Sequence, residues 1–130
     1  MRNDNRYFDI YPKIVRAGRE TTITIRPLFD HVRAAIATPE VTLYPAEGGR
    51  AQTAQMPPVT LAPTEMDGVL QVRHHFECEQ EYTLLIGNRE KPLAETRLYA
   101  LDDDLFTRRP YKGDLHIHSY HSDGKESPAY

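Results

Sequence analysis

Hydrophobic and polar residues alternate in several short segments of the chain. Within residues 21–26, Ile23 and Ile25 alternate with threonine, and every second residue from Leu70 to Phe76 is apolar or aromatic. This period of two is typical of a half-buried β-strand. Strands are predicted at residues 7–10, 21–26, 41–44, 59–61, 69–76, 82–86 and 96–101.

Turn-forming residues separate these segments. Pro12, Pro45 and the pair Gly48-Gly49 interrupt the early strands, and prolines on both sides of residues 59–61 favour a short or edge strand. About seven short strands in roughly one hundred residues predict an immunoglobulin-like antiparallel β-sandwich. Tyr82, at the start of a strand, resembles a tyrosine corner, in which the hydroxyl bonds upstream backbone.

Two segments carry no strand pattern. Residues 30–37, an alanine-rich stretch, form either one helical turn or a loop. Residues 102–109 are dense in charge and lack periodicity, which indicates a boundary. We therefore expect an accessory β-sandwich domain at residues 1–104, followed by a linker and the truncated start of a second domain at residues 105–130.

The candidate chemistry lies in this last segment. His116 and His118 are two residues apart in a predicted strand, so their side chains share a face with Cβ atoms roughly 6–7 Å apart. The following Ser122-Asp123-Gly124 favours a turn that brings the Asp123 carboxylate back toward them. Nitrogen and oxygen ligands in this combination suit Zn, Mn or Fe.

Residues 111–124, Tyr-Lys-Gly-Asp-Leu-His-Ile-His-Ser-Tyr-His-Ser-Asp-Gly, resemble the first motif of the PHP (polymerase and histidinol phosphatase) family. The family consists of metal-dependent phosphoesterases built on a distorted β/α barrel. The resemblance implies that His116, His118 and Asp123 are metal ligands and that Asp114 is structural. His121 competes with Asp123, since some members use a histidine in this loop.

The resemblance also implies a function for the full-length protein. It would hydrolyse phosphate esters of a small molecule or nucleotide, using a divalent metal (Zn, Mn or Fe), and nucleic acid remains a possible substrate. The other ligands would come from a C-terminal barrel, the expected partner of the sandwich. We expect the 130-residue chain alone to be inactive, because it carries one corner of such a site.

Composition narrows the possible binding partners and the cellular location. A net charge of −3 and a pI near 6.0 give no general attraction to nucleic acid or anionic lipid. Cys78 is the only cysteine, so the chain has no intramolecular disulfide, which fits a reducing compartment. No signal-like segment or apolar run of ~18 residues is present. A cytoplasmic location without membrane contact is therefore expected.

Two other functions stay open. The sandwich could be a protein- or carbohydrate-binding module without a catalytic role, which exposed aromatic residues such as Tyr7, Tyr11 and Tyr44 would favour. It could instead pack on the barrel and shape its cleft, which an uncovered apolar face near residues 101–111 would favour. His74 and His75 are adjacent, so they should point to opposite faces of their strand.

Overall fold

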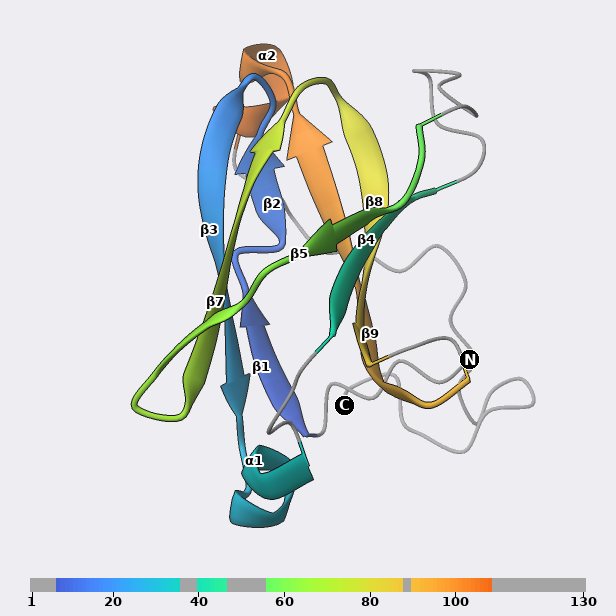
Figure 1. Ribbon diagram of the computed structural model, residues 1–130. Coiled ribbons are helices and arrows are strands. Elements are labelled where there is room, and N and C mark those ends of the chain that lie inside the picture. Colours follow the sequence, from blue (N-terminus) through green and yellow to red (C-terminus); the bar gives the residue numbers. More distant parts are fainter. Residues whose placement is uncertain (1–6, 36–39, 47–55, 88–89, 109–130) are drawn as a thin grey trace, which may run out of the picture.

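The computed structural model describes residues 7–35, 40–46, 56–87 and 90–108, in which two β-sheets pack face to face (Figure 1). The strands are β1 (Phe8–Tyr11), β2 (Ile14–Arg16), β3 (Arg19–Pro27), β4 (Val41–Pro45), β5 (Val59–Leu61), β6 (Thr64–Met66), β7 (Val69–Phe76), β8 (Gln80–Gly87) and β9 (Pro92–Leu101). Two short helices, α1 (Asp30–Ala35) and α2 (Asp103–Phe106), lie at opposite ends of the sandwich.

One sheet has the order β1-β3-β7-β6 and the other the order β2-β9-β8-β4-β5. This division of strands is that of an immunoglobulin-type sandwich. The expectation of a purely antiparallel sandwich needs one correction, because β2 runs parallel to β9, with Ile14 beside Tyr99. The chain leaves β1 in one sheet, passes the cis Tyr11-Pro12 peptide, and joins the other sheet as β2.

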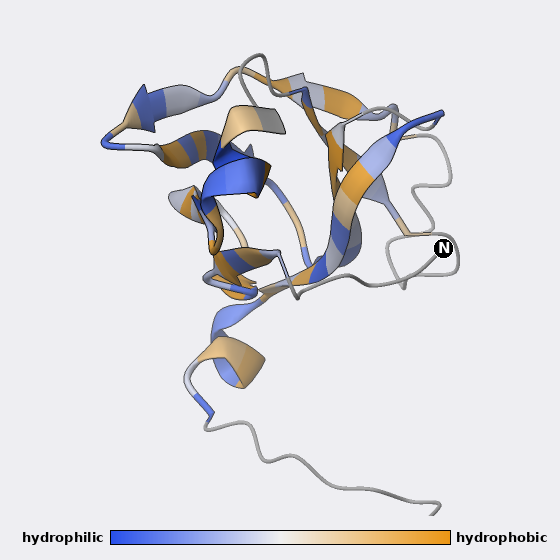
Figure 2. Cartoon of the chain, turned by 90° about the horizontal axis from the view of Figure 1, so that it is seen from below, coloured by the Kyte–Doolittle hydropathy of each residue, from blue (hydrophilic) through white to orange (hydrophobic). Residues whose placement is uncertain are grey.

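The core lies between the sheets and follows the predicted alternation, which appears as bands of colour along the strands in Figure 2. Ile23 and Ile25 of β3 are fully buried and face the alternate residues Leu84 and Ile86 of β8 across the core. Further core residues are Phe8, Ile10, Val15, Val41, Leu43, Leu70, Val72, Phe76, Tyr82, Leu98 and Ala100. Burial of these side chains is the main stabilising contribution to the fold.

All seven predicted strands are present, and β7 has the predicted bounds. Two strands, β2 and β6, were not predicted. Residues 30–37 contain the helix α1, the first of the two conformations considered. Residues 102–109 are not an irregular linker throughout, because they begin with α2, which packs against β2 and β9. The predicted strand that contains His116 and His118 lies outside the described residues, and the described residues include no part of a barrel.

Candidate binding surface

The predicted metal ligands cannot be placed. His116, His118 and Asp123, together with Asp114 and the competing His121, all lie outside the described residues. Within the described ranges, no group of three or more His, Cys, Asp or Glu residues is arranged to hold a metal ion. The metal site therefore remains an expectation from the sequence.

Three aromatic rings gather at the end of the sandwich that carries α1. The rings of Phe29 and His31 are stacked, with centroids 5.6 Å apart and an interplanar angle of 24°. Tyr7 meets both edge-on, at 6.3 Å from Phe29 and 6.1 Å from His31. We call Tyr7, Phe29 and His31 the aromatic cluster. Phe29 is 51% exposed and its neighbour Leu28 is 45% exposed, so the cluster forms part of an apolar surface.

Backbone hydrogen bonds hold this surface in place. The N–H of Leu28 donates to the carbonyl oxygen of Tyr7 at 2.9 Å, which extends the β1–β3 ladder beyond its last pair. The carbonyl oxygen of Phe29 accepts from the N–H groups of Val32 and Arg33, each at 3.1 Å, at the start of α1. Val32 is buried in the core, which fixes α1 on the sandwich. The rings are thus carried by anchored backbone.

The cluster differs from the group of Tyr7, Tyr11 and Tyr44 that would have favoured a binding module. Tyr7 belongs to it, but its ring partners Phe29 and His31 come from the segment between β3 and α1. Tyr11 lies further along β1 and is exposed. The signal that could have found the cluster is the run Leu28-Phe29-Asp30-His31, in which large apolar and aromatic residues stand outside any alternating strand.

The paired histidines of β7 behave as predicted. His75 is exposed, whereas His74 faces the interior and meets Phe76 edge-on, with ring centroids 4.8 Å apart. Burial lowers the pKa of His74, and the neighbouring His75 lowers it further, while Glu77 acts in the opposite direction. His74 is therefore held mainly as a neutral imidazole near neutral pH.

The tyrosine corner is not formed in the described part of the chain. Tyr82 is 3% exposed and packs its ring against Phe76, but its buried hydroxyl has no hydrogen-bond partner there. Burial raises the pKa of Tyr82 to about 12, with smaller contributions from Cys78 and Glu77. The hydroxyl thus remains a protonated donor at neutral pH.

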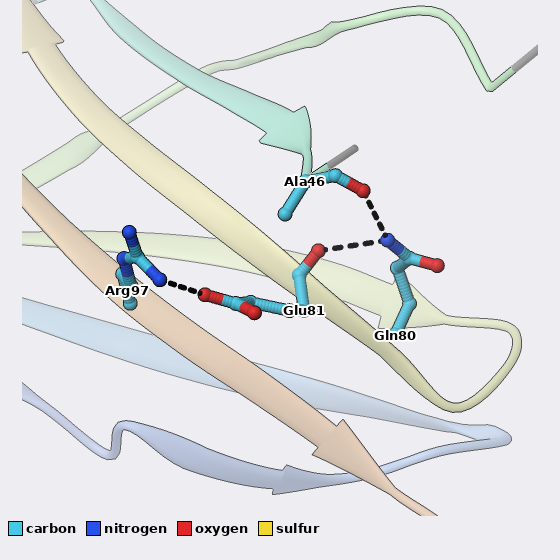
Figure 3. A network of polar contacts seen from close by, with 4 residues as sticks. All are labelled: Ala46, Gln80, Glu81 and Arg97. Carbon is cyan, nitrogen blue, oxygen red and sulfur yellow. Dashed lines mark hydrogen bonds and ion pairs between the residues drawn. The ribbon is translucent and has the colours of Figure 1, made fainter. Parts of the chain in front are cut away.

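A polar network fixes the end of β4 beside this region (Figure 3). The buried Gln80 side chain donates from Nε2 to the carbonyl oxygens of Ala46 and Glu81, both at 3.0 Å. The Glu81 carbonyl also accepts from the Ala46 N–H at 2.9 Å. On the outer face, the Arg97 guanidinium donates to the Glu81 carboxylate at 2.7 Å. These contacts hold β4, β8 and β9 in register.

A second exposed apolar group lies around α2. Ile14 of β2 and Tyr99 of β9 are register partners, and both are exposed, as is Leu105 of α2. α2, which carries Leu105, packs on both strands. Leu105 lies within residues 101–111, the region in which a packing role predicts exposed apolar side chains.

None of the described helices has the length and apolar character needed to cross a membrane. No protein-family model matches the sequence. The curated proteins likewise include no match.

Among solved structures, the chain is similar to the Lin-41 filamin domain, with 15% identity and a TM-score of 0.53 over 73% of this chain and 92% of that one. This likeness supports the fold alone: the described residues form an immunoglobulin-like β-sandwich. Two chains of superoxide reductase (neelaredoxin) from Ignicoccus hospitalis are 16% and 14% identical, each with a TM-score of 0.42. They cover 74% of this chain and 79% and 78% of their own lengths.

Proposed function

We propose that the sandwich is a protein-binding module and that the aromatic cluster is its contact surface. The observation that carries the proposal is the exposure of Phe29 and Leu28 beside rings whose backbone is anchored. Aromatic residues are enriched at the centres of protein interfaces, where their burial supplies much of the binding free energy. A rigidly held ring also loses little conformational entropy on binding.

The ring geometry favours a protein partner over a carbohydrate. Tyr7 stands at 70° to Phe29 and 83° to His31, so the cluster has a stepped surface rather than a flat platform. A stepped apolar surface complements the side chains of another protein. Sugars also require several polar partners beside a stacking ring, whereas the most exposed side chains of this surface, Leu28 and Phe29, are apolar.

The test places a photo-reactive phenylalanine analogue at position 29 of the full-length protein in its own cells. The control places the same analogue at position 73, on the exposed face of β7. The expected product is a discrete protein captured from position 29 and absent from position 73. Its purified form should bind the chain about tenfold or more weakly after Phe29→Ala. Arg73→Ala should leave the affinity unchanged.

Two outcomes would reject this function. One is a purified partner whose affinity for the Phe29→Ala variant equals that for the wild type. The other is Phe29-dependent binding on a glycan array without a protein partner, which would assign the surface to carbohydrate.

A second candidate function is that of an accessory domain of a metal-dependent phosphoesterase. The exposed Ile14, Tyr99 and Leu105 around α2 support it, because a following domain would cover them. The proposed metal ligands are His116, His118 and Asp123, and this assignment depends on the motif at residues 111–124. A barrel-forming C-terminal domain would supply the other ligands and the substrate pocket.

Metal titration of the protein tests this candidate. Zn or Mn should bind with an affinity that falls in His116→Ala, His118→Ala and Asp123→Ala, while His121→Ala keeps it. Equal affinities for the wild type and the His116→Ala variant would reject the metal assignment. Loss of affinity in His121→Ala but not in Asp123→Ala would show that His121, and not Asp123, is the third ligand.

A further inference from the structure

The outer face of the five-stranded sheet is buried at one place. Leu85 of β8 points to this face, because its neighbours Leu84 and Ile86 belong to the core between the sheets. Leu85 is nevertheless only 2% exposed, and Thr42 of β4, its register partner, is buried as well. Neither described helix packs extensively on β8 or β4. Side chains on a bare outer face keep part of their surface, so this burial indicates that a further segment covers the face.

The same face continues as an apolar surface toward α2. Tyr99 of β9 and Ile14 of β2 point outward and are exposed, since the residues next to them in each strand belong to the core. Arg16 lies on this face too, and its guanidinium meets the ring of Phe106 in α2. This contact places α2 at the corner of the outer face, where β2 and β9 end (Figure 1). The chain therefore leaves α2 on the side of the sheet to which Leu85 points.

The sequence after α2 contains a strand pattern that suits this face. In the strand predicted to contain His116 and His118, Leu115 and Ile117 alternate with the two histidines. Successive side chains of a strand point to opposite sides, so Leu115 and Ile117 share the side turned away from the imidazoles. The strand thus has one apolar side and one side that carries the candidate metal ligands.

The other segments outside the described residues lack such a pattern. They are either mainly polar, as at residues 1–6 and 47–55, or shorter than five residues, as at residues 36–39 and 88–89. None of them presents two large apolar side chains at alternate positions. The segment after α2 is therefore the best occupant of the outer face that this chain offers.

The length of the chain allows this segment to reach Leu85. Glu95, the register partner of Leu85, lies six residues before Leu101 at the end of β9. Leu85 is thus about 20 Å along the sheet and about 5 Å across it from that end. Ile117 lies nine residues beyond Arg108, the last described residue. Nine extended residues span about 30 Å, which is sufficient.

We propose that residues 114–119 dock as an extended strand across the outer face of the five-stranded sheet. Leu115 then contacts Tyr99, and Ile117 contacts Leu85. The two histidines of the strand point away from the sandwich, side by side, and the backbone polar groups at its edges remain free to pair with further strands. The sandwich thereby orients the histidine pair toward a following domain. The inference rests on the predicted strand of the accessory-domain candidate and not on its metal assignment.

Nuclear Overhauser effects in the 130-residue protein test the docking without any substitution. The methyl groups of Leu115 should give cross-peaks to the ring protons of Tyr99, and the δ1 methyl of Ile117 should give cross-peaks to a methyl of Leu85. The imidazole protons of the same strand should give none to the sandwich. Absence of both methyl cross-peaks, or cross-peaks from the imidazoles to Leu85, would overturn the proposal.

A pair of double variants tests which side of the strand makes the contact. A soluble gadolinium chelate relaxes exposed methyl groups, so in the wild type it should barely affect the buried Leu85 methyls. Leu115→Ser/Ile117→Ser should raise this relaxation severalfold, because the cover of Leu85 is lost. The matched control, His116→Ser/His118→Ser, changes the opposite side of the strand and should leave Leu85 shielded.

The core methyl groups of Leu84 report whether each variant keeps the fold, since they should stay shielded throughout. Unchanged relaxation of Leu85 in Leu115→Ser/Ile117→Ser would mean that another segment covers it, and an equal rise in the histidine variant would reverse the orientation. Either result would reject the proposal. Neither bears on the aromatic cluster, which the photo-crosslinking experiment tests separately.

Discussion

The guanidinium of Arg16 lies over the ring of Phe106, with its central carbon 4.7 Å from the ring centroid. The contact joins β2 to α2, the element from which the chain continues toward the predicted metal motif. The Arg16 Nε also lies 3.0 Å from an Asp103 carboxylate oxygen, but it makes no aligned hydrogen bond within the described residues. The cation–π contact is therefore the stronger of the two ties.

Arg16→Ala should lower the free energy of unfolding by about 1 kcal/mol, because the half-buried cation–π contact and the packing of the side chain are both lost. Asp103→Asn should cost less than about 0.5 kcal/mol, since the carboxylate is exposed. Urea denaturation measures both values, with Arg73→Ala on an exposed strand face as the control. A larger cost for Asp103→Asn than for Arg16→Ala would show that the ion pair dominates.

Two glycines with positive φ angles provide a matched pair. Gly87 has a φ of +89°, and a Cβ there would lie 2.6 Å from the carbonyl oxygen of Lys91. Gly18 has a φ of +78°, and apart from its chain neighbours no atom of the described residues lies within 4 Å of such a Cβ. Gly18→Ala should therefore cost about 1 kcal/mol of unfolding free energy from backbone strain alone.

Gly87→Ala should cost clearly more, by about 2 kcal/mol or above, because steric overlap adds to the strain at the β8–β9 connection. Chemical denaturation of the two variants in parallel measures the difference. Equal costs would mean that the backbone near Lys91 moves aside freely.

The sequence predicted the strands that show alternation or are bounded by prolines. β7 was predicted with its full length because Leu70, Val72 and Phe76 alternate with exposed residues, and the three-residue β5 because prolines flank it. β6 has three exposed residues, and β2 is three residues long with one buried residue, so neither shows a period. The parallel pairing of β2 was not predictable, since it depends on which sheet the chain joins after Pro12.

The candidate sites also divide into features that the sequence predicts and features that depend on the tertiary structure. The opposite orientations of His74 and His75 followed from strand geometry alone. The tyrosine corner is not formed within the described residues, because the partner of the Tyr82 hydroxyl depends on backbone placement that local sequence does not determine. The aromatic cluster brings Tyr7 beside Phe29 and His31, residues far apart in the sequence, which is a tertiary property.

Acid should destabilise the sandwich through His74. Its pKa is lowered in the folded state, chiefly by burial, so the unfolded chain binds a proton first as the pH falls. The contribution of His74 to stability is complete above pH 6.5, the ordinary value, and is lost as the pH falls toward the folded-state pKa. Urea midpoints on either side of pH 6.5 should show this loss in the wild type.

The loss should be smaller in His74→Leu, which cannot titrate, and unchanged in Arg73→Ala, which alters an exposed side chain on the same strand. An identical acid dependence in the wild type and His74→Leu would assign the effect to other groups.

Alkali should destabilise the protein, because the pKa of Tyr82 is higher in the folded state than in the unfolded state. An unfolded tyrosine ionises near pH 10.0, whereas burial raises the pKa of Tyr82 to about 12 in the folded protein. Between these values the folded state holds a proton that the unfolded state releases, so stability falls as the pH rises through this window. A shift of this size corresponds to a loss of about 2–3 kcal/mol of unfolding free energy from pH 10.0 to about 12.

Other tyrosines and lysines titrate in the same range, so the measurement is the difference between the wild type and Tyr82→Phe. Denaturant unfolding across this pH range should give a flatter profile for Tyr82→Phe, because its buried ring carries no ionisable group. Tyr99→Phe, which removes an exposed hydroxyl, should keep the wild-type slope. If Tyr82→Phe and the wild type lose stability in parallel, the pKa of Tyr82 is the same in the folded and unfolded states, and this prediction is wrong.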